Sequence, residues 1–169
     1  MIGSTILSAE AALRVGTGSV KIICSKKTLP IYSLKFSSVL KVEINNLNLL
    51  KKLIAKEKNS VFLIGPGAGS NQLTKKKTKL ILKNIKHVII DADALTCFKQ
   101  NPKELYGLLD KNKIITPHIK EFHTIFPKIS KKITNYEKII KASKICKCLL
   151  PLSMWRILIH MKLQKNLRF

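Results

Sequence analysis

Ser60–Gly69 reads SVFLIGPGAG, an apolar, β-branched run that ends in a turn with three glycines. Two later stretches repeat this arrangement, His87–Leu95 (HVIIDADAL) and Lys113–Phe122 (KIITPHIKEF). Apolar runs of this composition predict buried strands. Because ligands bind beyond the carboxyl ends of parallel strands, three polar motifs at three such ends should converge on one crevice. The pattern is typical of an α/β enzyme.

The rest of the chain alternates between helical and strand patterns. This alternation predicts a three-layer fold, a parallel sheet with helices on both faces. Residues 25–45 stay ambiguous, since Pro30 interrupts any regular element there. We expect helices over Thr5–Val15, Asn48–Lys58, Leu73–Leu82, Lys103–Leu109 and Ile133–Cys146, and strands over Ser19–Cys24, Val39–Ile44, Ser60–Ile64, Lys86–Ile90 and Lys113–Ile115, with a further strand beginning at Cys148.

Composition fits one domain with a sizeable core, since 46% of the 169 residues are hydrophobic. The net charge of +23 points in isolation to a polyanionic partner. However, the lysines are spread over nearly every segment and aromatic residues make up only 6% of the chain, so we do not expect specific nucleic-acid binding. No apolar run reaches the length of about 18 residues that spans a membrane. The four cysteines form no CxxC pair, which favours free structural thiols and a cytoplasmic location.

The sequence changes character after Leu150. We divide the chain into a domain over residues 1–150 and a divergent basic tail over 151–169, in which Trp155, Arg156 and His160 lie among aliphatic residues. One interpretation of the tail is a basic amphipathic helix that touches a membrane or a partner. The interpretation that we favour is a non-native tail, such as a shifted reading frame produces.

The glycine turn could bind an anion. Gly65 and Gly67 allow a sharp turn that brings backbone N–H groups close to a phosphate, beside the N-terminus of the following helix. Tight strand-to-helix turns also use glycine for purely steric reasons. Asp91 and Asp93 could hold Mg²⁺ through water or accept hydrogen bonds from a sugar hydroxyl. The alternative for Asp93 is that it caps a helix.

The third motif carries a histidine and a carboxylate. His118 follows a Thr-Pro step, which holds the backbone extended and would direct the imidazole from a rigid position toward the crevice. With Glu121 nearby, it could orient a substrate or shuttle a proton. A single histidine after a strand is, however, more often structural.

Together these blocks resemble the ADP- or ATP-dependent NAD(P)H-hydrate dehydratase family. The matching blocks are a helix ending in Ala12-Leu13-Arg14-Val15-Gly16-Thr17-Gly18, then Ile64-Gly65-Pro66-Gly67-Ala68-Gly69, Asp91-Ala92-Asp93-Ala94-Leu95, and Thr116-Pro117-His118 with Glu121-Phe122. The resemblance covers residues 1–150. It implies a ribokinase-like fold, truncated at both ends. Lys120 departs from the family pattern, in which a glycine is usual.

The resemblance also implies a function, the repair of hydrated NAD(P)H, with ADP or ATP and Mg²⁺ as cofactors. The substrate-binding residues that we infer are Ser4, Thr5, Gly65, Gly67, Asp91, Asp93, His118 and Glu121. The family's Gly-Thr-Gly-Asp loop, which supplies the catalytic aspartate, does not occur in these 169 residues, so we expect no catalytic residue here and an inactive fragment, either monomeric or a homo-oligomer. The alternatives are another ribokinase-fold kinase, or a non-catalytic basic module that binds nucleotides or nucleic acid.

Overall fold

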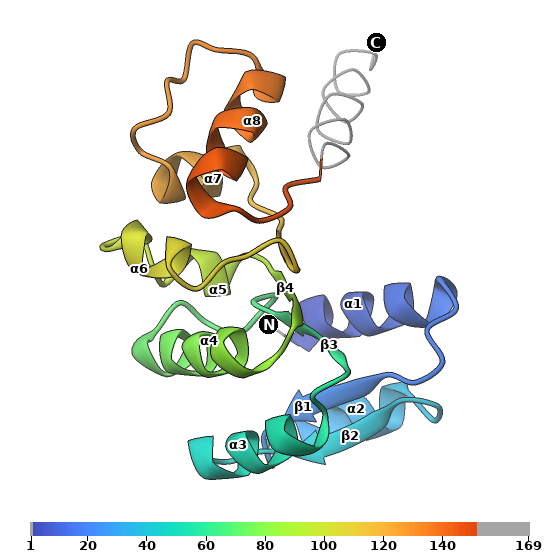
Figure 1. Cartoon of the computed structure of the whole chain (residues 1–169). Helices are drawn as coiled ribbons and strands as arrows, with labels where there is room; N and C mark the ends of the chain where they lie inside the picture. The colour runs from blue at the N-terminus through green and yellow to red at the C-terminus, as the bar shows by residue number, and fades with distance from the viewer. Residues whose placement is uncertain (1, 152–169) are drawn as a thin grey trace, which may run out of the picture.

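The computed structural model describes residues 2–151, which form an α/β fold in which all paired strands are parallel (Figure 1). The strands fall into two hydrogen-bonded sheets, β1-β2 and β3-β4-β5, a division that the sequence did not predict. A single parallel bridge between Ile114 and Leu149 continues the larger sheet beyond β5, where a strand beginning at Cys148 was expected. The strands are β1 (Lys21–Cys24), β2 (Leu40–Glu43), β3 (Val61–Ile64), β4 (His87–Ile90) and β5 (Lys113–Ile115).

Eight helices accompany these strands in the described part of the chain, and five of them overlap the helices that the sequence predicted. Three of them, α2, α5 and α7, were not predicted, and α2 lies where Pro30 was taken to interrupt regular structure. Pro30 instead lies in the first turn of that helix, where its missing N–H has no helical partner to lose. The helices are α1 (Ile2–Arg14), α2 (Leu29–Lys35), α3 (Leu47–Lys56), α4 (Gln72–Asn84), α5 (Asp93–Thr96), α6 (Pro102–Tyr106), α7 (Ile119–Ile125) and α8 (Asn135–Cys146).

Two hydrophobic clusters stabilise the fold. The smaller cluster joins α1, β1 and α2 and includes Ile22 and Tyr32. The larger one surrounds β3, β4 and β5, and its centre contains the fully buried Ile90, Ile115 and Phe122. Because this larger core holds β3, β4 and β5 in register, it also fixes the relative positions of the loops at their carboxyl ends.

One face of the larger sheet is open at β3. Phe62 points into the core, whereas its neighbours Val61 and Leu63 are 64% and 46% exposed. Parallel sheets are normally covered on both faces, so these side chains form an unusual apolar surface.

No helix in residues 2–151 is long and apolar enough to cross a membrane. The predicted tail over residues 151–169 lies outside the described residues, apart from Pro151.

Candidate site at the carboxyl ends of the parallel strands

The first two motifs meet at Gly65. This residue ends β3 with φ of +129°, in a region that L-residues avoid. A Cβ atom built on Gly65 would lie 1.7 Å from the backbone oxygen of Asp91 and 3.1 Å from Cβ of Ala94. The backbone hydrogen bond from Asp91 N–H to the Ile64 carbonyl, at 3.0 Å, continues the pairing of β3 with β4 to this point. Glycine is therefore required here because two strand ends touch.

Asp93 ties the glycine turn to β4. Its Oδ2 accepts the N–H of Gly69 at 2.9 Å, across 24 positions of sequence. The predicted alternative, that Asp93 caps a helix with its side chain, is wrong, because α5 begins at Asp93 itself and its N-cap is Ala92. The Asp93 side chain thus holds the glycine turn against the start of α5.

The glycine turn uses several of its N–H groups within the protein. The N–H of Ala68 donates to Gly65 O, and that of Asn71 donates to Gly69 O, both at 3.0 Å. Asn71 also caps α4 by accepting the N–H of Thr74 at 2.9 Å. With Gly69 N–H directed at Asp93, this turn is not an open cradle of free donors for a phosphate. Contacts between substrate and Gly65 or Gly67 stay a prediction.

The backbone of the site is strained at Ala92. Its φ and ψ are 44° and −119°, an uncommon region for a residue with a Cβ. The carbonyl of Ala92 accepts N–H groups from Leu95 and Thr96 at 2.9 and 3.0 Å, which keeps the peptide in place. Outliers of this kind cluster at functional sites. Sequence reasoning missed Ala92, since no glycine or asparagine marks the position.

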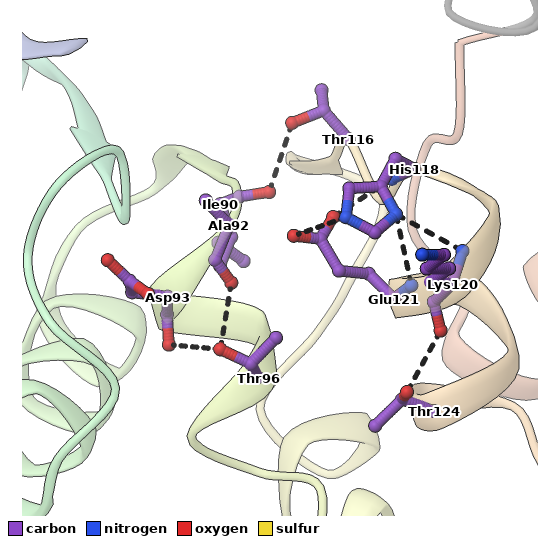
Figure 2. Close-up of polar contacts among 9 residues, drawn as sticks. All are labelled: Ile90, Ala92, Asp93, Thr96, Thr116, His118, Lys120, Glu121 and Thr124. Carbon is purple, nitrogen blue, oxygen red and sulfur yellow. Dashed lines mark hydrogen bonds and ion pairs between the residues drawn. The ribbon is translucent and has the colours of Figure 1, made fainter.

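The third motif joins the same edge of the sheet through Thr116. Its N–H donates to the Ile90 carbonyl at 3.1 Å, and its hydroxyl lies 3.4 Å from the same oxygen (Figure 2). No pattern in the sequence predicted this contact of Thr116. The next turn of chain, from Pro117 onward, therefore starts beside the end of β4.

His118 and Glu121 form a capping box at the start of α7. Nδ1 of His118 accepts the N–H groups of Lys120 and Glu121 at 3.1 and 3.3 Å, and Oε2 of Glu121 accepts the N–H of His118 at 2.9 Å (Figure 2). This arrangement satisfies helix N–H groups that would otherwise lack partners. The structural role considered for His118 is therefore present, together with a ring that is 52% exposed.

The same hydrogen bonds assign the tautomer of the neutral imidazole. Because Nδ1 is an acceptor, the ring proton lies on Nε2. Nε2 is 3.4 Å from Oε1 of Glu121. The exposed ring thus presents an N–H donor, which suits it to orient an oxygen of a substrate more than to accept a proton.

The buried Glu121 carboxyl is the most perturbed acid of the site. Burial raises its pKa, and the nearby carboxylates of Asp91 and Asp93 raise it further, against the opposing effects of the His118 N–H group and imidazole. The three carboxyl groups come from the ends of β4 and β5. Asp91 and Asp93 thus lie close enough to Glu121 for their charges to act on its carboxyl group.

These carboxylates do not form a metal centre in the structure. Within residues 2–151, no group of three or more His, Cys, Asp or Glu side chains is placed to hold a metal ion. Mg²⁺ is usually held by one or two carboxylates together with water and phosphate oxygens, so the water-mediated Mg²⁺ site considered for Asp91 and Asp93 stays a prediction.

Ser4 and Thr5 lie apart from the network. They occupy the first turns of α1, where the Ser4 carbonyl accepts the Ser8 hydroxyl at 2.9 Å. No hydrogen bond or ion pair between described residues links either side chain to the three strand-end motifs, so their role in substrate binding stays a prediction.

The described residues share the ribokinase-like fold of several solved structures. A ribokinase-like superfamily protein from Enterococcus faecalis aligns with a TM-score of 0.70 at 23% identity, over 88% of this chain and 52% of its own. An ADP/ATP-dependent NAD(P)H-hydrate dehydratase from Bacillus subtilis, co-crystallized with ATP/Mg²⁺, aligns with a TM-score of 0.60 at 19% identity, over 89% of this chain and 54% of its own.

Residues 1–149 match the family model described as NAD(P)H-hydrate dehydratase, and the chain belongs to that family. A bifunctional NAD(P)H-hydrate repair enzyme from Dictyoglomus turgidum is 29% identical over 133 residues, which are 73% of this chain and 25% of the relative. An ADP-dependent (S)-NAD(P)H-hydrate dehydratase from Streptococcus pneumoniae is 27% identical over 126 residues, 73% of this chain and 42% of the relative. The chain thus spans less than half the length of these relatives.

Proposed function

We propose that this chain binds hydrated NAD(P)H at the carboxyl ends of β3, β4 and β5 and contributes to its dehydration back to NAD(P)H with ADP or ATP. The observation that carries the proposal is the convergence of the three family motifs at one sheet edge, through Gly65 against Asp91, Asp93 on Gly69, and Thr116 on Ile90. The nucleotide would supply the phosphoryl group that makes the hydrate hydroxyl a leaving group.

In this proposal the residues of the chain bind and orient the substrate. The Nε2–H group of His118 donates to an oxygen of the hydrate, and the capping box holds the ring in place. Asp91 accepts a hydrogen bond from a hydroxyl of the ligand. Asp93 acts through another residue, by keeping the glycine turn against β4.

Binding is tested by NMR titration of the hydrate into labelled protein. We expect the signals of Gly65, Gly67 and His118 to shift first. In a His118→Asn variant, the asparagine oxygen can still cap α7 but the imidazole donor is lost, so binding should weaken while the fold survives. The matched control is Thr134→Ala, which removes the equivalent capping box of α8. Shifts confined to the lysine-rich α4, and abolished by moderate salt, would contradict the proposal.

Turnover is tested separately, by following the return of nicotinamide absorbance with ADP or ATP and Mg²⁺. The 169 residues contain no Gly-Thr-Gly-Asp sequence. Loss of a positioned general base typically costs about 10² to 10⁴ in rate, so this chain assayed alone should bind without measurable turnover. A rate near that of a relative with the complete loop would contradict this expectation.

A further inference from the structure

A broad hollow of about 840 Å³ lies between α7, the loop that follows it, and α8. Figure 1 shows this loop arching from α7 to α8. The hollow has a strongly positive lining that contains no Asp or Glu. The cationic residues are Lys120 from α7, Lys128 and Lys131 from the loop, and Lys138 from α8, and the imidazole of His123 lies beside them.

Lys138 distinguishes this hollow from an ordinary lysine-rich surface. The residue is only 5% exposed, and its Nζ makes one long hydrogen bond, 3.5 Å to Oδ1 of the neutral Asn135 side chain. No ion pair within residues 2–151 includes Lys138. An ammonium group has three N–H donors, and burying its charge without an anion is costly. A bound anion would offset that cost.

The neighbouring groups reinforce the positive potential. None of Lys120, Lys128 and Lys131 forms an ion pair with another described residue. Burial lowers the pKa of His123, and the charges of Lys138 and Lys131 lower it further, so both ammonium groups act on the imidazole inside the hollow. Glu137, the acid next to Lys138 in sequence, is instead engaged in the capping box with Thr134.

We propose that this hollow binds a polyphosphate group, either free pyrophosphate or the diphosphate of a nucleotide. Four lysines from three segments match several negative charges better than a single carboxylate would, and lysine binds phosphate as a point charge. No Phe, Tyr or Trp lines the hollow to stack on a base. Recognition should therefore depend on the phosphates, and it does not require the strand-end site or its substrate.

The test is calorimetric titration of pyrophosphate into the full chain at about 0.15 M salt, where long-range attraction is screened. Lys138→Met should weaken binding roughly tenfold or more, as expected for a charge-assisted contact with a buried ammonium. Lys131→Met, an exposed position in the hollow, should weaken it as well and serves if Lys138→Met fails to fold. The matched control Lys144→Met removes an exposed lysine of α8 outside the hollow and should change the affinity by less than about twofold.

Two further ligands identify the source of the phosphates. ADP that binds like pyrophosphate supports recognition of the diphosphate alone, and ADP that binds more tightly supports a nucleotide as the ligand. The proposal fails if pyrophosphate does not bind, or if Lys138→Met, Lys131→Met and Lys144→Met weaken it equally. It also fails if a duplex oligonucleotide binds and depends on Lys138 as strongly as pyrophosphate does, because the hollow would then belong to a nucleic-acid surface.

Discussion

Substitution of Gly65 by alanine should destabilise the protein more than any ordinary surface change. The new Cβ would lie 1.7 Å from Asp91 O, whereas non-bonded contacts of carbon are comfortable at about 3.5 to 4.0 Å. The strand ends would have to separate by roughly 2 Å. In addition, a φ of +129° costs a residue with a side chain about 1 to 3 kcal/mol. With a similar cost of about 1 to 3 kcal/mol for overpacking, the total is about 2 to 6 kcal/mol.

The assay is urea unfolding followed by far-UV circular dichroism, with Gly107→Ala as the matched control. Gly107 has φ of −67°, and its Cβ would approach only to 3.8 Å from the Lys103 oxygen. Alanine there should be neutral or should stabilise the protein by about 0.4 to 1 kcal/mol. For a domain whose unfolding free energy is about 5 to 15 kcal/mol, the loss at Gly65 is large. If Gly65→Ala unfolded within about 1 kcal/mol of the wild type, the close contact between the β3 and β4 ends would be refuted.

Two further predictions concern charge and the open sheet face. Burial raises the pKa of Glu121 above its usual 4.5. Between pH 4.5 and that higher pKa, the folded protein therefore keeps a proton that the unfolded chain has already released. The free energy of unfolding should fall as pH rises through this range, because Glu121 must then ionise in a buried place. Glu121→Gln can still accept the His118 N–H but cannot ionise, so its stability should rise relative to that of the wild type as pH increases across this range. Urea titrations at several pH values measure this. A difference in unfolding free energy between the two proteins that does not change with pH would contradict the assigned direction. Val61→Lys, on the exposed face of β3, should reduce aggregation measured by light scattering. It should change the free energy of unfolding by less than about 0.5 kcal/mol. The control Phe62→Lys places a charge in the core and should unfold the domain. A large destabilisation by Val61→Lys would mean that this face is packed in solution.

The fold class followed from local patterns. Apolar β-branched runs such as Val61–Ile64 and His87–Ile90 predict buried parallel strands, since each is short, continuous and followed by a turn signal. Asparagine is a residue type favoured at helix N-caps. Asn71 caps α4 by accepting the N–H of a residue only three positions further along the chain, so this contact depends on local sequence. The order of the glycine, Asp-Ala-Asp and Thr-Pro-His blocks also carried the family assignment, which the family model confirms. The prediction at Pro30 was wrong, because the effect of a proline depends on whether it lies inside a helix or in its first turn.

The roles of the site residues depended on tertiary structure. Sequence spacing could not reveal that Asp93 binds Gly69, since the two are 24 positions apart and meet only because β3 and β4 pair in register. Likewise, the steric need for glycine at position 65 arises from the Asp91 carbonyl of the neighbouring strand. The raised pKa of Glu121 requires burial and two carboxylates from another motif. The sequence by itself determined the order of the local elements, because helix and strand formation depends largely on neighbours along the chain. Only the packed structure decided which polar groups meet, because those contacts depend on long-range strand pairing and on the exclusion of water.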